Sequence, residues 1–256
     1  MPSTQTWGLT AVERRSTTDH VLAELRAAII SGRIGPSEPL RETALARTLG
    51  TGRSAIREAI RHLVQEGLVE YRLNRGSYVR ALTVQDSDDL YLAREAIEVC
   101  AVRQALERGE QLDLTCLEAA LDRIREAARE TPDDQPAGTE LIAADLDFHR
   151  EMVRLSGSPR LSRAHETLAA EAQMFMHHQP IYPPWDYAAD HSVLLEAIAK
   201  HSPEAPDLVR EHLRLSAKLI AGEITREAET HDAATEPVDI TPRAGRATSG
   251  QAENGR

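Results

Sequence analysis

The stretch from Leu45 to Val79 reads LARTLGTGRSAIREAIRHLVQEGLVEYRLNRGSYV, and its hydrophobic period changes once along its length. In the first part, apolar residues recur every three or four positions, which predicts one helix over 41–49 and another over 54–66. The turn between them, Gly50-Thr51-Gly52, is short enough to force a sharp angle. In the second part the period falls to about two, which predicts a small hairpin with Asn74-Arg75-Gly76 at its tip.

A further helix precedes this stretch. Its apolar positions, from Val21 to Ile29, have helical spacing, and Gly32 ends it. Three helices with a sharp turn between the last two, followed by a hairpin, form a winged helix-turn-helix. We therefore expect a winged-helix domain over residues 16–82.

The third helix carries a row of arginines. Arg53, Arg57 and Arg61 lie four residues apart, on the side away from Ile56, Ile60 and Leu63. A helix that enters the major groove places such side chains against base edges, where an arginine fork binds guanine O6 and N7 together. Such a row also occurs as a plain solvated surface, so it indicates DNA binding only in combination with the turn and the hairpin. In that combination we expect all three arginines to contact DNA.

Three more residues are candidates for DNA contact at the ends of these elements. Ser54 stands at the start of the third helix, where it can donate to a phosphate and where the helix N-terminus itself favours anions. Arg75 at the hairpin tip can enter a minor groove or hold a phosphate. Gly76 lets the backbone approach the nucleic acid closely.

Charge is distributed unevenly along the 256 residues, whose formal net charge is −11. Residues 11–82 carry 12 basic and 8 acidic side chains, whereas residues 83–227 carry 15 basic and 28 acidic ones. A positive N-terminal segment on an acidic chain fits a phosphate backbone as its partner.

Composition excludes several classes of protein. No run approaches the ~18 consecutive apolar residues of a membrane helix, and the N-terminus lacks the basic-then-apolar order of a signal peptide. The two cysteines, Cys100 and Cys116, are too few for a disulfide scaffold or a cysteine-rich zinc site, and we expect both to be small buried residues. These features predict a cytoplasmic, helix-rich protein without a membrane partner. The aperiodic ends, residues 1–15 and 228–256, are expected to be disordered.

The stretch from Val21 to Val79 resembles the winged-helix domain of GntR-family bacterial transcription regulators. The motif residues of that family are present as Leu45-Ala46, Leu49-Gly50, Arg53, Arg57-Glu58-Ala59, Glu66-Gly67-Leu68 and Arg75-Gly76. The sequence departs from the family pattern at Gly52 and Ser54-Ala55, where Ser or Thr and then Thr-Pro are usual, and at Thr43, where some relatives carry another arginine. The operator sequence therefore cannot be transferred from relatives.

The remaining part of the chain has helical periodicity and no alternating strand pattern. After a linker over 80–85, six amphipathic helices are expected, at 86–106, 114–129, 140–155, 160–178, 186–200 and 207–227. Six such helices pack as an antiparallel bundle, which we expect to form a second domain over 83–227. The expected fold class is mainly α, with a small β-hairpin wing.

Four side chains of this second domain suit a divalent metal. Asp145 and His149 are four residues apart and share one face of a helix. His191 and His212 lie on the last two helices, and an antiparallel bundle can bring them to the same interior point. Three imidazoles and a carboxylate are suitable ligands for Zn²⁺ or Ni²⁺. The chain has ten histidines, so the spacing alone also fits histidines unrelated to metal.

The same domain resembles the all-helical FCD ligand-binding domain of the FadR subgroup of GntR regulators. The resemblance rests on Arg94-Glu95 with Glu98, Asp145 with His149, Ser158-Pro159-Arg160-Leu161, and Asp190-His191 with Ala197-Ile198. It implies a metal site at the Asp/His cluster, and an inward-facing Arg94 that pairs with an anionic effector as a fork meets a carboxylate. An intrahelical pair with Glu98 is the alternative role for Arg94.

One interval departs from the FCD pattern. The spacing from His191 to His212 is one residue shorter than the family implies. Because a slip of one residue turns a side chain by ~100° around its helix, His212 is the ligand whose register is least fixed.

Together these features predict a dimeric transcription regulator, a repressor rather than an activator, that responds to a small carboxylate. Each winged helix would read one half of a short palindrome, because a two-fold dimer requires a two-fold site. The effector would change the spacing of the two heads, which requires unequal affinity for the two spacings. The alternative is a metal-dependent hydrolase built on the Asp/His cluster. Since no obvious general base stands beside the cluster, and the DNA-binding head would have no role, we do not expect an enzyme.

Overall fold

The computed structural model describes residues 16–109, 111–132, 137–179 and 184–235, although not the side chains of 184–186 and 227–235. Within these ranges the chain is mainly helical, as the sequence predicts. In chain order the elements are α1 (Thr17–Ile30), α2 (Glu42–Thr48), α3 (Arg53–Gln65), β1 (Val69–Arg72), β2 (Gly76–Val79), α4 (Val84–Glu107), α5 (Thr115–Glu130), α6 (Thr139–Arg154), α7 (Pro159–His178), α8 (Pro184–Ala199) and α9 (Ala205–Thr235). None of the described helices is long and apolar enough to cross a membrane.

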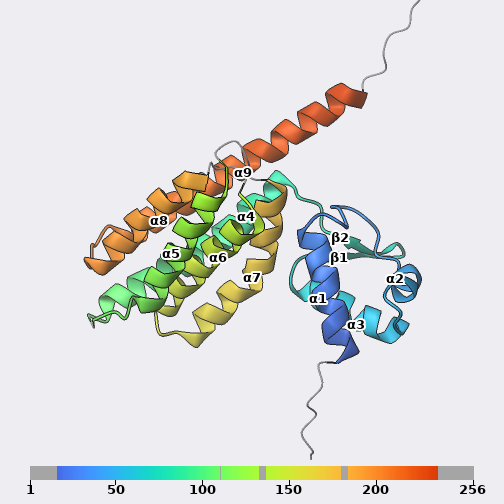
Figure 1. The fold of residues 1–256 in the computed structure, drawn as a ribbon, viewed down its shortest axis with the longest axis horizontal. Coiled ribbons are helices and arrows are strands. Elements are labelled where there is room, and N and C mark those ends of the chain that lie inside the picture. The colour runs from blue at the N-terminus through green and yellow to red at the C-terminus, as the bar shows by residue number, and fades with distance from the viewer. Residues whose placement is uncertain (1–15, 110, 133–136, 180–183, 236–256) are drawn as a thin grey trace, which may run out of the picture.

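The N-terminal part, α1 to β2, has the expected winged-helix arrangement (Figure 1). Ile56, Ile60 and Leu63 bury the inner face of α3 against α1, because residues three and four apart share one side of a helix. β1 and β2 pair antiparallel, with Val69 opposite Val79. The segment before α2 extends this hairpin, since the Leu40 amide donates to the Ser77 carbonyl at 2.8 Å.

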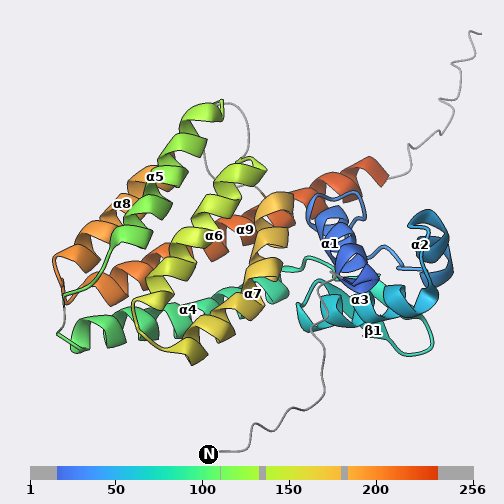
Figure 2. The ribbon, with the colours of Figure 1, turned by 60° about the horizontal axis from the view of Figure 1, so that its bottom comes forward.

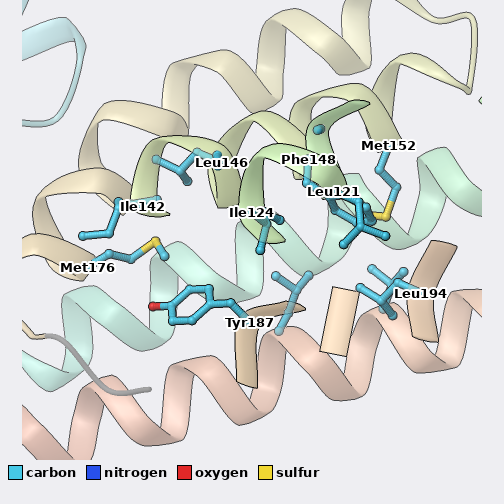
Figure 3. Close-up of a cluster of buried hydrophobic side chains, with 14 of the residues drawn as sticks. Leu121, Ile124, Ile142, Leu146, Phe148, Met152, Met176, Tyr187 and Leu194 are labelled. Carbon is cyan, nitrogen blue, oxygen red and sulfur yellow. The ribbon is translucent and has the colours of Figure 1, made fainter. Parts of the chain in front are cut away.

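The C-terminal part, α4 to α9, is a helical bundle in which α9 runs along α4 and α5 lies between α6 and α8 (Figures 1 and 2). Its core contains large buried side chains from several helices, among them Leu121, Ile124, Phe148 and Leu194 (Figure 3). Burial of such side chains contributes roughly 1.5–3 kcal/mol each, so this core holds the bundle together and fixes the helices that carry the polar residues.

The two parts meet at α7, the helix of the bundle that contacts α1 and lies beside it in Figure 1. Phe175 on α7 is buried in the bundle core, whereas Met174, the preceding residue, is fully buried in the core of the winged helix. Arg80, just after β2, lies 3.7 Å from the Glu171 carboxylate of α7 and donates from Nε to the Gly67 carbonyl at 2.7 Å. One helix thus contributes to both hydrophobic cores.

Two expected boundaries differ from the structure. The linker expected over 80–85 is shorter, because Thr83 caps α4 by accepting a hydrogen bond from the Asp86 amide, and the helix begins at Val84. Helix α9 continues to Thr235, so the disorder expected from 228 is wrong as far as that residue. The expectations for residues 1–15 and 236–256 lie outside the described residues.

The cysteines also differ from expectation. Cys100 and Cys116 are both exposed and unbonded to each other, not buried. Each lies on the outer face of its helix, α4 or α5, where a small side chain is tolerated without packing.

Candidate functional site

The three arginines of α3 lie where the sequence predicts. Arg53, Arg57 and Arg61 are exposed, whereas Ile56 and Ile60 on the same helix are buried. Two of them are held by carboxylates. The Arg57 guanidinium donates from Nε and Nη2 to the two oxygens of Glu42 on α2, and Arg61 pairs with Glu58 on α3 itself.

The start of α3 is open to an anion. Gly52 is its N-cap and makes no side-chain capping hydrogen bond. Ser54, in the first turn, is exposed. A helix start without a capping side chain keeps backbone amides available, and these amides with the helix dipole attract a phosphate.

The hairpin presents the other expected contacts. Arg75 is exposed at the turn, and its amide donates to the Arg72 carbonyl at 3.0 Å. Gly76 has φ +96°, a conformation that side chains rarely adopt, so glycine is required to close this turn. Between the hairpin and the start of α2 lies a hollow of about 450 Å³ lined by Pro39, Leu40, Arg41, Glu42, Tyr71, Arg75, Gly76, Ser77 and Tyr78.

The bundle brings the four expected metal ligands to one interior point. Asp145 and His149 come from α6, His191 from α8 and His212 from α9. Ring nitrogens of the three histidines lie within 4.8 Å of one another. The Asp145 carboxylate lies 3.0 Å from Nε2 of His191. The shorter interval before His212 therefore does not remove it from the cluster.

Hydrogen bonds at the outer nitrogens determine what these rings present inward. Nδ1 of His191 lies 2.6 Å from the Tyr187 carbonyl, and Nδ1 of His149 lies 2.6 Å from the Glu98 carboxylate. Both partners accept only, so each Nδ1 carries a proton. The two Nε2 atoms lie 3.3 Å apart, and Nε2 of His191 also faces the Asp145 carboxylate, so in the neutral rings these atoms present unshared electron pairs to one point. Such a concentration of lone pairs is suited to a bound cation.

Burial and charge favour the protonation states that a metal requires. Burial lowers the pKa of His149 although Glu98 opposes this effect. Burial, with His191 and His149 nearby, lowers the pKa of His212 well below its usual value. Burial would raise the pKa of Asp145, but His191, His149 and Arg94 outweigh it and hold that pKa below its usual value. Burial thus favours the neutral forms of His149 and His212, and the groups around Asp145 favour its charged carboxylate.

Arg94 and Glu98 form a buried layer behind the cluster. Their side chains are 3% and 0% exposed, and Arg94 Nε donates to Glu98 at 2.9 Å. Glu98 also lies 3.1 Å from Nε2 of His165 on α7. Burial raises the pKa of Glu98, but Arg94 and His149 outweigh that effect and hold it well below its usual value. The intrahelical pair considered for Arg94 is therefore present.

That pair leaves part of Arg94 free. Its Nη2 atom is buried without a hydrogen-bond partner among the described residues. Arg94 borders a small cavity of about 10 Å³, enough for one water- or ion-sized centre, beside the metal-ligand cluster. The cavity is lined by Tyr91, Arg94, Asp145, His149, Met176, Tyr187, Asp190, His191, His212 and Ser216.

Two members of this centre were missed from the sequence. His165 was not singled out, and Glu98 was considered only as a partner of Arg94. The i,i+4 spacing of Arg94 and Glu98 was a visible signal, but the contacts of Glu98 with His149 and His165 depend on how α4, α6 and α7 are rotated against one another.

Comparison with protein families matches both parts of the chain. Residues 17–79 match the family described as bacterial regulatory proteins, gntR family. Residues 89–215 match the FCD domain. These two ranges contain α3 with its arginines and the whole Asp/His cluster.

Individual relatives agree with these matches. The chain is 29% identical over 192 residues to the HTH-type transcriptional regulator YdhC of Bacillus subtilis, covering 75% of each chain. It is 26% identical over 194 residues to the HTH-type transcriptional repressor RspR of Escherichia coli, covering 74% of this chain and 82% of RspR. The crystal structure of a GntR transcriptional regulator from Rhodococcus sp. RHA1 has 27% identity and a TM-score of 0.67, covering 80% of this chain and 97% of that one.

The matched families and these relatives are transcription regulators, not enzymes, so the hydrolase alternative has no support among them. The two parts of the structure correspond to the two matched domains. The winged helix carries the exposed arginines, and the bundle contains the buried polar centre. The chain belongs to the GntR family of bacterial transcription regulators and is a DNA-binding regulator with an FCD domain.

Proposed function

We propose that this protein represses transcription as a homodimer, with each winged helix bound to one half of a short palindromic operator in the bacterial cytoplasm. The exposed row of Arg53, Arg57 and Arg61 supports base reading by α3. In this proposal Ser54, Arg75 and Gly76 contact the DNA backbone, and the open start of α3 and the positive φ of Gly76 support this role. A two-fold dimer requires a two-fold site, which sets the symmetry of the operator. The relative RspR is named as a repressor.

The FCD domain, in this proposal, holds one divalent metal, Zn²⁺ or Ni²⁺, at Asp145, His149, His191 and His212. The observation that carries this assignment is the convergence of two Nε2 atoms 3.3 Å apart and a carboxylate, each ring having its proton committed to the outer nitrogen. Without a cation the facing lone pairs repel one another. Glu98 and the Tyr187 carbonyl then act as the outer hydrogen-bond partners that orient metal-binding histidines in proteins.

The effector is a small carboxylate that reaches Arg94 beside the metal. The buried Nη2 of Arg94 offers an unused donor for an anion. The cavity of about 10 Å³ is too small for such a molecule, so binding requires neighbouring side chains to move. Met176 lines the cavity, and Met174, two residues earlier on α7, is buried in the winged-helix core. Movement of α7 would therefore reach the DNA-binding head directly.

Metal analysis of the purified full-length protein tests the proposed centre. We expect about one Zn²⁺ or Ni²⁺ per chain, removal by a chelator, and rebinding of the added metal with a rise in the melting temperature. His212→Ala should abolish rebinding. His62→Ala, which removes an exposed histidine of α3, should retain it. A protein that neither retains nor rebinds metal would contradict the metal assignment.

A footprint on the upstream region of its own gene tests the regulatory role. We expect protection of a palindromic site that weakens or strengthens when a panel of mono-, di- and hydroxycarboxylates is added to metal-loaded protein. Protection that no carboxylate changes would remove the effector from the proposal. Absence of any protected site there or in neighbouring promoters at moderate salt would overturn the operator assignment.

A further inference from the structure

We propose that Glu42 is a positioning residue for base recognition: from α2 it orients the Arg57 guanidinium on α3 and leaves one edge of that group free for a guanine. This inference rests on the proposed reading of bases by α3. It adds a residue of the neighbouring helix, which itself need not touch DNA, to the determinants of sequence specificity.

The contact between the two residues is bidentate. Arg57 Nε lies 3.2 Å from Glu42 Oε1, and Arg57 Nη2 lies 2.8 Å from Glu42 Oε2. Two parallel hydrogen bonds fix the plane of a guanidinium, whereas a single bond leaves it free to turn. The Arg57 side chain is 61% exposed, so without Glu42 it would sample many rotamers.

Part of the Arg57 guanidinium remains available for DNA. A guanidinium has five N–H groups, and Glu42 uses the edge formed by Nε and Nη2. The end formed by Nη1 and the second hydrogen of Nη2 stays free. That end is itself a two-donor fork, which is the arrangement that binds guanine O6 and N7. Glu42 and a guanine can therefore hold Arg57 at the same time.

The Glu42–Arg57 pair differs from the Glu58–Arg61 pair on the same surface. Arg61 pairs with Glu58, three residues away on α3, so that pair depends on one helix only. Glu42 and Arg57 join two helices, and the pair therefore connects the arginine to the relative orientation of α2 and α3. The hydrogen bonds from Arg57 also lower the pKa of Glu42, so its carboxylate stays charged at neutral pH.

A fixed carboxylate on a DNA-binding face has two effects on affinity. It orders Arg57 before the operator binds, which reduces the entropy lost in the specific complex. It also repels the phosphates of any duplex that offers no guanine in return. Both effects increase the ratio of specific to non-specific affinity, so Glu42 acts on discrimination more than on total binding.

The test uses the full-length protein and a library of duplexes with a random 20-base-pair core. The wild type selects its preferred duplex, and affinities for that duplex and a shuffled one are then measured at two salt concentrations. Glu42→Gln should lower the affinity ratio about tenfold and flatten the base preference at one position in each half-site. Arg57→Ala should flatten the same position, and the double variant should lose no more there than Arg57→Ala alone.

Glu58→Gln is the matched control, because it removes the same charge from the same surface and frees Arg61. It should change both affinities by a similar factor and keep the base preference at the Arg57 position. Circular dichroism and the melting temperature should be equal for the two glutamine variants. Wild-type base preference in Glu42→Gln, or a profile equal to that of Glu58→Gln, overturns the role of Glu42. If the wild type enriches no sequence, base reading by α3 fails, and this inference fails with it.

Discussion

The winged helix and the bundle each contain a Glu–Arg ion pair within a single helix, but the pair in the winged helix is exposed and the pair in the bundle is buried. On α3, Glu58 and Arg61 are three residues apart, and their side chains are 42% and 66% exposed. On α4, Arg94 and Glu98 are four residues apart, and they are 3% and 0% exposed. An exposed pair contributes less than about 1 kcal/mol and exchanges partners easily. A buried pair is costly to break, because the remaining charge has no water. The Glu58–Arg61 pair is thus suited to exchange its partners, and the buried Arg94–Glu98 pair to keep them.

The largest expected effect follows from breaking the buried pair. Glu98→Ala leaves Arg94 charged and unpaired inside the bundle, and it removes the acceptor of His149 and His165. The free energy of unfolding should fall by about 3–5 kcal/mol in urea titrations. Glu58→Ala on α3 should lower it by less than about 1 kcal/mol.

Equal losses for the two variants would contradict the contrast between the environments. If Glu98→Ala does not fold, Glu98→Gln keeps the volume and one hydrogen bond and should be intermediate in stability. A Glu98→Gln protein as stable as the wild type would show that the charge of Glu98 is not required in the core.

The contrast also explains what the sequence could predict. The DNA-binding face comes from one continuous stretch, so the helix, the arginine row and the hairpin tip follow from local periodicity. In the bundle, the shared face of Asp145 and His149 follows from their spacing on α6. The link from Glu98 to His165 does not, because it depends on the rotation of α4 against α7.

The Glu42–Arg57 pair also could not be predicted from local sequence patterns. Residues 42 and 57 lie on different helices, and their contact depends on the angle set by the turn between α2 and α3. Periodicity identifies which side of a helix is exposed, but it does not choose the rotamer of an exposed arginine. The fold was therefore more predictable than the pairs made by its charged side chains.

The second effect tests how the two regions are joined. Met174→Ala removes a fully buried side chain that the bundle contributes to the winged-helix core. We expect a loss of about 2–5 kcal/mol and two separate unfolding transitions in calorimetry, because the head no longer unfolds together with the bundle. Met152→Ala, in the bundle core only, should lower the stability while keeping one transition. One transition in Met174→Ala at the wild-type temperature would exclude α7 as the connection.

The third-largest expected effect concerns only the exposed face of α3. Arg57→Ala should weaken operator binding by roughly tenfold or more, through loss of a two-donor contact with guanine. Its melting temperature should equal that of the wild type, because the side chain is exposed. Arg103→Ala, which removes an exposed arginine of α4, controls for the change in net charge and should bind the operator normally. Wild-type operator affinity in Arg57→Ala would contradict the assignment of α3.

The smallest expected effect concerns Glu171 at the junction between the two regions. Burial raises its pKa, Arg80 opposes this, and Asp86 and Asp89 add to it. Because the pKa is higher in the folded state, the protonated form favours folding. That contribution is fully present below the unfolded pKa of about 4.5 and is lost as the pH rises through the folded value.

Glu171→Gln, which stays neutral, should therefore match the wild type well below pH 4.5 and exceed its stability at pH 7. The difference should stay below about 1 kcal/mol, because solvent reaches the Arg80 pair and screens it. Urea midpoints of both proteins at the two pH values measure it. A wild type more stable than Glu171→Gln at pH 7 would mean that the attraction to Arg80 outweighs the cost of burial. The junction would then resemble the Arg94–Glu98 pair more than the exposed pairs of α3.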